Sequence, residues 1–281
     1  MTGDAVLTGD AVLTGAAGVS NDPMVGLLQR FAEDWLNHAD AGVCTQIMHS
    51  DYAVHIGGIV LNGLEEYVPA TMGQLEQFPG LKIAVHDVFS NGRTAALRFT
   101  EHGPSTRDDS REAAWSGIAL FWSNGEVLVR NVTEEDYTSR RRQLASGLTD
   151  AIEAAMIAPW STAAVPADAV LESRVRLWLE SGGLAAADAT EIVFDEGGVD
   201  HASILDGAEI RVRDIFSAGD SVAFQVSETG AYRVGLGLPE SLVGVVGTLS
   251  SVGIVRSAAG GRFEGHVVRD RAGLRRALSR G

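Results

Sequence analysis

Two histidines and an arginine occur where strand-like runs could present them to a binding cavity. His55 stands near the end of one run, just before the Gly57-Gly58 pair. Arg98, Thr100 and His102 alternate along another run and therefore share one of its faces. An imidazole suits general acid–base catalysis because its pKa is about 6.5, and an arginine can stabilise an enolate or a carboxylate. We expect a histidine base with Arg98 beside it, although an exposed polar face explains the second run equally well.

A third candidate group lies on the strand-like run that ends before residue 136. Asn131, Thr133 and Glu135 alternate there on one face. Asn131 and Thr133 could orient a carbonyl or a water molecule by hydrogen bonding, or could simply line a pocket. Glu135 belongs to the acidic run 134–136, which could reach the pocket or form a solvated rim that pairs with the arginines after it.

Apolar and aromatic side chains at core spacing could border the same cavity. Most such side chains only fill a core, but some must line any ligand pocket. The seven histidines show no HxH, HExxH or CxxC spacing, and no nucleotide-binding motif occurs, so the sequence predicts neither a metal nor a cofactor. The residues expected to bind a substrate are Trp35, Tyr52, Tyr67, Met72 and Trp115.

The chain contains two copies of one domain. Segments 125–147 and 261–281 both read D-x-x-x-x-R-R-[QA]-L-[AS]-x-G from their aspartates, Asp136 and Asp270. Upstream, segments 86–103 and 213–230 align without a gap. Repeats of this length and order indicate a tandem duplication.

Apolar periodicity and turn residues predict helices followed by strands in the first copy, which is the order of an α+β domain. In the second copy the stretch that corresponds to the third helix is absent, so this copy is trimmed by one helix. The expected helices are 23–36, 39–48 and 63–78, and the expected strands are 51–60, 81–89, 93–102, 114–122 and the start of 125–147. The expected domains are a disordered tail (1–22), a first domain (23–147), a linker (148–168) and a second domain (169–281).

Composition excludes several classes of partner. A net charge of −15 argues against nucleic acid, because phosphate binding needs clustered Lys and Arg. No apolar run reaches the roughly 18 residues of a membrane span, and no secretory leader is evident. Cys44 is the only cysteine, which suits a reducing compartment. We expect a cytoplasmic protein.

The element order, the Gly-Gly strand end and the ending from Asp136 to Ala145 resemble the nuclear transport factor 2-like superfamily, and within it the SnoaL-like polyketide cyclases. This resemblance implies two cone-like (cystatin-like) domains, each with a curved antiparallel sheet and N-terminal helices around an apolar pocket. SnoaL-like cyclases and limonene-epoxide hydrolases carry their main catalytic aspartate three residues before the position of Asp136. That position is Thr133 here and Val267 in the second copy, and the partner histidine falls near Ile118 or Ala119.

The resemblance implies a cofactor-free cyclase, isomerase or dehydratase acting on a small lipophilic carbonyl compound in the first domain. Epoxide opening is the alternative reaction, and its carboxylate could come only from Glu135, Glu101 or Asp51. Loss of the usual aspartate favours a third reading, a non-catalytic binding or assembly module. We expect the second domain to be structural and to pack against the first as an intrachain pseudo-dimer, with homodimerisation left open.

Overall fold

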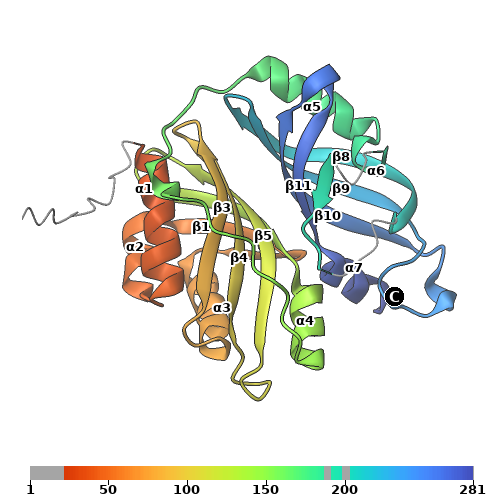
Figure 1. The fold of residues 1–281 in the computed structure, drawn as a ribbon, viewed down its shortest axis with the longest axis horizontal. Coiled ribbons are helices and arrows are strands. Elements are labelled where there is room, and N and C mark those ends of the chain that lie inside the picture. The colour runs from red at the N-terminus through yellow and green to blue at the C-terminus, as the bar shows by residue number, and fades with distance from the viewer. Residues whose placement is uncertain (1–21, 187–190, 198–202, 281) are drawn as a thin grey trace, which may run out of the picture.

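The computed structural model describes residues 22–186, 191–197 and 203–280, which form two α+β domains, each built on one sheet (Figure 1). This confirms the predicted fold class. Apart from Asp22, the predicted tail lies outside the described residues. None of the described helices combines the length and the apolar character that a membrane span requires.

The first domain opens with helices that cover one face of its sheet. Helix α1 (Pro23–Arg30) begins where Asp22 accepts a hydrogen bond from the Met24 amide at 2.9 Å, with a proline at the first helical position. A π-helical segment (Phe31–Asn37), a short helix α2 (Cys44–Ile47) and helix α3 (Leu64–Gln77) follow. The predicted helix at 39–48 is present in shortened form, as one 3-10 turn (Ala41–Val43) that leads into α2, and strand β1 already begins at Met48.

Six strands form the first sheet in the order β2-β1-β6-β5-β4-β3. The Gly57-Gly58 turn, where both residues have positive φ, separates β1 from β2 and favours glycine at both positions. β1 pairs with β6 in parallel, which departs from the expected antiparallel sheet. The strands are β1 (Met48–Ile56), β2 (Ile59–Asn62), β3 (Lys82–Ser90), β4 (Thr94–Pro104), β5 (Glu112–Ser123) and β6 (Leu128–Glu135), followed by helix α4 (Tyr137–Ser146).

The second sheet repeats this topology without the hairpin strand. Its order is β7-β11-β10-β9-β8, and β7 pairs with β11 in parallel as β1 does with β6. Between β7 and β8 the described residues contain no counterpart of α3. The elements are α5 (Ala169–Glu180), α6 (Gly183–Ala186), β7 (Ile192–Phe194), β8 (Leu205–Ala218), β9 (Ser221–Tyr232), β10 (Val246–Ser257), β11 (Phe263–Arg269) and α7 (Arg271–Leu278).

Each sheet has an inner face, which its own N-terminal helices cover, and an outer face, which meets the other domain. One buried apolar cluster draws on both outer faces, with Ile118, Leu120 and Val132 from the first sheet against Val252 and Ile254 from the second. Burial of this apolar area removes it from water and holds the two sheets together. The arrangement also leaves the inner face of the first sheet free to enclose a cavity.

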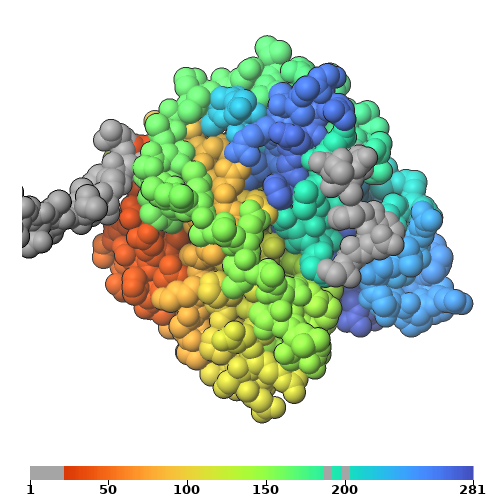
Figure 2. Space-filling view, viewed as in Figure 1, coloured from red at the N-terminus to blue at the C-terminus, as the bar shows by residue number. Residues whose placement is uncertain are grey.

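The segment between α4 and α5 is hydrogen-bonded to the first domain. Its backbone pairs with the edge strand β3 through Met156 N to Val85 O at 2.7 Å and Val165 N to Ser90 O at 2.9 Å. In the space-filling view this linker, in green, lies against the first domain (Figure 2). The linker therefore covers a sheet edge that would otherwise expose unpaired backbone groups.

Candidate active site

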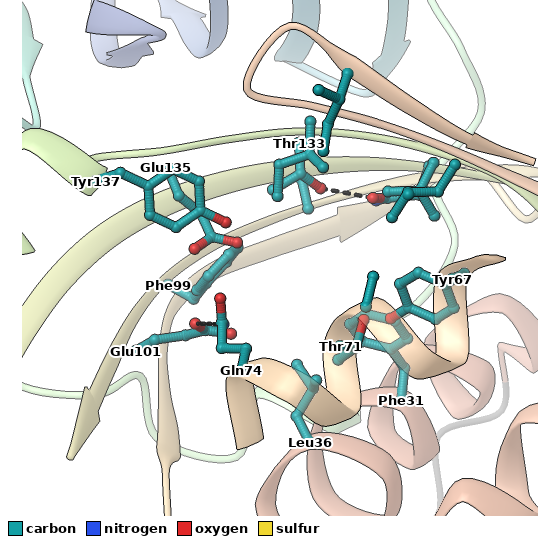
Figure 3. Close-up of a pocket in the computed structure, with 17 residues that line it drawn as sticks. Phe31, Leu36, Tyr67, Thr71, Gln74, Phe99, Glu101, Thr133, Glu135 and Tyr137 are labelled. Atoms are coloured by element: carbon teal, nitrogen blue, oxygen red, sulfur yellow. Dashed lines mark hydrogen bonds between the residues drawn. The ribbon is translucent and has the colours of Figure 1, made fainter. Parts of the chain in front are cut away.

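A cavity of about 180 Å³ lies between the inner face of the first sheet and helix α3 (Figure 3). Its walls are mostly apolar, and polar side chains come from β4, β6 and α3. Figure 3 shows Glu101, Glu135, Gln74 and Tyr137 gathered at one end, with Phe31 and Tyr67 toward the other. The residues that line it are Phe31, Leu36, Val54, Ile56, Ile59, Leu61, Tyr67, Ala70, Thr71, Gln74, Phe99, Glu101, Ala119, Asn131, Thr133, Glu135 and Tyr137.

Two buried carboxyl groups dominate the polar end of the cavity. Glu101 lies on β4 directly opposite Trp115 on β5, and Glu135 lies on β6 opposite Gly117 on β5. Both glutamates are less than a tenth exposed. Gly117 has no side chain, and the ring of Phe99 occupies the space where its Cβ would stand. The sheet register therefore brings two acids together beside one aromatic wall.

Glu135 accepts hydrogen bonds from two neighbouring side chains. The indole Nε1 of Trp115 donates to its Oε2 at 2.8 Å, and Tyr137 also hydrogen bonds to it. Burial raises the pKa of Glu135, while these hydrogen bonds and the charge of Arg140 oppose the rise. Hydrogen bonds to a carboxylate favour its ionised form.

Glu101 has the more strongly raised pKa of the two groups. Burial raises its pKa well above 4.5, and the neighbouring charge of Glu135 raises it further. Gln74 Nε2 donates to its Oε2 at 2.8 Å, and Arg140 Nη1 in turn donates to Gln74 Oε1 at 3.2 Å. Two adjacent carboxyl groups in an apolar site share one proton, because both cannot ionise at low cost.

Arg140 and Tyr137 close this end of the site from helix α4. The Arg140 guanidinium lies 4.4 Å from the centroid of the Tyr137 ring and 4.9 Å from that of Trp115. A cation over aromatic faces is stabilised without direct contact with a carboxylate. Helix α4 starts at this point because Asp136 accepts a hydrogen bond from the Ser139 amide at 3.1 Å.

Asn131 and Thr133 line the cavity beside Glu135, so the structure brings together the three residues predicted on the last strand. The Thr133 hydroxyl donates to Asn131 Oδ1 at 2.6 Å, and Asn131 Nδ2 donates to the Leu120 carbonyl at 3.2 Å. These bonds fix both side chains in the cavity wall. Neither group titrates, so both can only position a ligand or a water molecule.

The structure places His55 outside the cavity, which corrects its expected position. On β1, Val54 and Ile56 line the cavity, and strand alternation turns His55 toward the outer face. There, burial lowers its pKa and the charge of Arg130 lowers it further.

Arg98 and His102 also lie away from the cavity, because Phe99 and Glu101 occupy the inner face of β4. Arg98 donates to Asp195 of the second domain at 2.6 Å and to Glu153 of the linker at 2.6 Å. These ion pairs connect the two domains. Arg98 therefore lies at the interdomain surface, and the proposed role of the Arg98–Thr100–His102 face in the pocket is corrected.

Among the predicted aromatic and apolar binding residues, Tyr67 lines the cavity and the others lie behind its wall. Trp35 Nε1 donates to the Tyr67 hydroxyl at 3.0 Å, and the Tyr52 ring packs 5.3 Å from the Tyr67 ring. Met72 packs against the core, and Trp115 reaches the site through its bond to Glu135.

From the sequence, Glu101 was expected only as an alternative carboxylate, and Gln74, Tyr137 and Arg140 were not expected at the site. A signal for Glu101 existed, because Leu97, Phe99 and Glu101 alternate and the first two are apolar. Asp51 is 89% exposed at its side chain and cannot supply a pocket carboxylate. No group of three or more His, Cys, Asp or Glu suited to a metal ion occurs among the described residues.

Comparison with known proteins identifies the first domain. Residues 28–131 match the family model of the SnoaL-like domain. Similar solved structures include a candidate polyketide cyclase from Acidithiobacillus ferrooxidans (15% identity, 46% of this chain and 99% of that chain, TM-score 0.41) and TsrD from Streptomyces laurentii (18%, 46% and 99%, 0.41). A candidate SnoaL-like polyketide cyclase from Jannaschia sp. CCS1 is 14% identical over 46% of this chain and 94% of that chain, with a TM-score of 0.42. A search of curated proteins returns no match. Over residues 28–131, the first domain is similar to the SnoaL-like domain.

Proposed function

We propose that the first domain is a cofactor-free acid–base enzyme of the cyclase, isomerase or dehydratase kind, acting on a small lipophilic carbonyl compound. The observation that carries this proposal is the pair of buried glutamates in a mostly apolar cavity. Glu135 would take a proton from the carbon next to the carbonyl, and protonated Glu101 would donate a hydrogen bond to the enolate oxygen. In this proposal, the two glutamates take the acid–base role that the sequence suggested for His55 and His102.

Deuterium exchange tests the proposal without knowledge of the natural substrate. The probe is 2-tetralone, a lipophilic ketone with acidic α-protons, in D₂O with the full chain. Binding is first verified by quenching of tryptophan fluorescence, and loss of the α-proton NMR signal then reports turnover. The proposal predicts exchange faster than with the Glu135→Gln variant. Bound 2-tetralone that exchanges no faster than free 2-tetralone would favour a binding module instead.

Epoxide opening is the second candidate, because it also needs one neutral and one charged carboxyl group. Protonated Glu101 would protonate the epoxide oxygen while Glu135 takes a proton from the attacking water, and the product is a diol. Arg98 lies outside the cavity, so the arginine of the related hydrolases is not supplied from this position. Diol formation from styrene oxide, measured by chromatography, separates this reaction from proton exchange.

We further propose that the second domain is a structural partner within an intrachain pseudo-dimer. The apolar cluster between the outer faces and the Arg98–Asp195 ion pair support this role. The site as proposed lies in the first domain alone. The buried, unpaired Cys44 fits a reducing compartment such as the cytoplasm.

A further inference from the structure

A wider groove adjoins the cavity and shares three lining residues with it, Ile56, Ile59 and Tyr137. Its volume is about 630 Å³. Ile59 is 55% exposed, so an apolar side chain is present at the surface where the two spaces meet. A ligand too long for the cavity would continue into this groove.

The groove is cationic on a chain whose net charge is −15. Three arginines line it, Arg140, Arg141 and Arg276, against one carboxylate, Asp108. Asp108 already accepts a hydrogen bond from the Ser105 hydroxyl at 2.6 Å. An anion approaching this otherwise acidic protein therefore meets a local concentration of positive charge beside the cavity.

Two of these arginines have guanidinium groups available for a ligand. Among residues 22–186, 191–197 and 203–280, neither Arg141 nor Arg276 forms an ion pair, and both are exposed. Arg276 Nη2 donates to the Gly57 carbonyl at 2.6 Å, which places its head group at the hairpin turn of the first domain. Its charge also acts on Asp270 from a distance.

Both domains build the groove. Arg141 belongs to α4 of the first domain and Arg276 to α7 of the second, and the two helices contact each other near the domain junction (Figure 1). The second domain thus contributes a side chain beside the cavity of the first.

We propose that this groove binds the anionic group, a carboxylate or a phosphate, of an amphipathic substrate whose apolar part occupies the cavity. Guanidinium groups bind both anions with paired hydrogen bonds, and the apolar side chains at Ile56, Ile59 and Leu144 accommodate the adjoining chain. This inference rests on the proposed function and narrows its substrate class. It also adds one ligand-binding side chain, Arg276, to the structural role proposed for the second domain.

Calorimetric titration of the full chain with decanoate, decyl phosphate and 1-decanol tests the groove. These probes share an apolar chain and differ in the head group, so the two anions also distinguish a carboxylate from a phosphate ligand. We expect at least one anion to bind about tenfold or more tightly than 1-decanol. Arg276→Gln and Arg141→Gln should each weaken binding of that anion about fivefold or more and leave 1-decanol unchanged.

Matched controls lie next to each arginine. Arg275 and Arg142 are exposed neighbours that do not line the groove, and Arg275→Gln and Arg142→Gln should leave anion binding within about twofold. Equal affinity for the anions and 1-decanol, no binding of either anion, or equal losses in the controls would overturn the proposal. Anion binding is measured by calorimetry and proton exchange of 2-tetralone by NMR, so failure of the chemistry and failure of the groove give different results.

Discussion

At corresponding positions of their sheets, the first domain carries Glu101 and Glu135 and the second carries Glu228 and Arg269. In the second domain Arg269 forms a bidentate ion pair with the buried Glu196, at 2.6 and 2.7 Å. Burial raises the pKa of Glu228, while the charge of Arg269 opposes the rise. The same fold therefore holds two acidic groups in one domain and an acidic and a basic group in the other.

On the proposed function, this difference decides which domain can exchange protons near neutral pH. Two buried acids retain a shared proton that can be passed to a ligand, whereas a buried arginine–carboxylate pair stays ionised and has no proton to give. If the proposed function holds, the arginine at the position of Glu135 would leave the second domain without the proposed base.

The cavities differ for a related reason. Helix α3 supplies Tyr67, Thr71 and Gln74 to the first cavity, and the described part of the second domain has no such helix. The second domain has a cavity of only about 70 Å³ between its sheet and α6, bordered by Glu228 and Arg269. In the described part of the second domain, the absence of this helix leaves a smaller enclosed space than in the first.

The largest expected effect is on catalysis in the first domain. Glu135→Gln removes the proposed base and should lower the rate of proton exchange by about 10²–10⁴-fold. Glu228→Gln is the matched change in the second domain and should leave the rate within about twofold. The measurement is the NMR exchange rate of 2-tetralone. Similar losses in both variants would show that the comparison between domains does not describe catalysis.

A large effect on stability is expected at the domain junction. The Arg271 side chain is 1% exposed, and its Nη2 donates to Asp136 Oδ1 at 2.5 Å across the junction while its Nε lies 3.2 Å from Glu196. Arg271→Met leaves these carboxylates without this partner and should lower the free energy of unfolding by about 3–5 kcal/mol. Urea unfolding measures this, with the exposed Arg275→Met as a near-neutral control. A loss below about 1 kcal/mol would exclude Arg271 as a link between the domains.

A pH-dependent effect is expected from Glu134, whose counterpart in the second domain is Val268. Burial raises its pKa from 4.5 to about 8, and the charge of Asp270 adds to the rise. Because the folded state keeps a proton that the unfolded chain releases above pH 4.5, stability falls as the pH rises through this window and levels off above pH 8.

Glu134→Gln should remove this dependence. The difference in unfolding free energy between variant and wild type should grow in favour of the variant by about 2–4 kcal/mol from pH 5 to pH 8. Denaturant titrations at several pH values measure it. A difference that stays constant over that range would mean that Glu134 ionises normally in the folded protein.

The smallest expected effect comes from Thr133→Asp, which restores the aspartate that the resemblance predicts at this position. The new carboxyl group would be buried beside Glu135 and should lower stability by about 1–2 kcal/mol at pH 7.5, and by less at pH 4.5, where it is protonated. Thr133→Asn provides the uncharged control. An unchanged melting temperature at both pH values would contradict a position of Thr133 in the cavity wall.

The fold could be predicted from the sequence because the signals that specify it are local or repeated. The internal repeats predicted two similar sheets, and both are present with the same strand order apart from the hairpin strand β2. Turn residues located the strand ends, and alternation on the last strand placed Asn131, Thr133 and Glu135 on one face, all lining the cavity.

The same reasoning failed on β4 because that strand is buried on both faces. Alternation of polar and apolar residues identifies the inner face only where the outer face meets solvent. From the sequence alone, Arg98 resembles a catalytic residue, because its ion-pair partners Asp195 and Glu153 are distant in sequence. Pairing of Glu101 with Glu135 depends on the register across β5, which no local pattern encodes.

The central claim, that Glu101 and Glu135 share a proton, is tested most directly by a titration of their carboxyl groups. Full-length protein labelled with ¹³C at the glutamate carboxyl carbon would be followed by NMR, with Glu101→Gln and Glu135→Gln used for assignment. We predict that one group of the pair titrates well above 4.5, and that removing Glu135 brings the pKa of Glu101 back toward that value. Two groups that both titrate at or below 4.5, unaffected by the loss of the other, would contradict it.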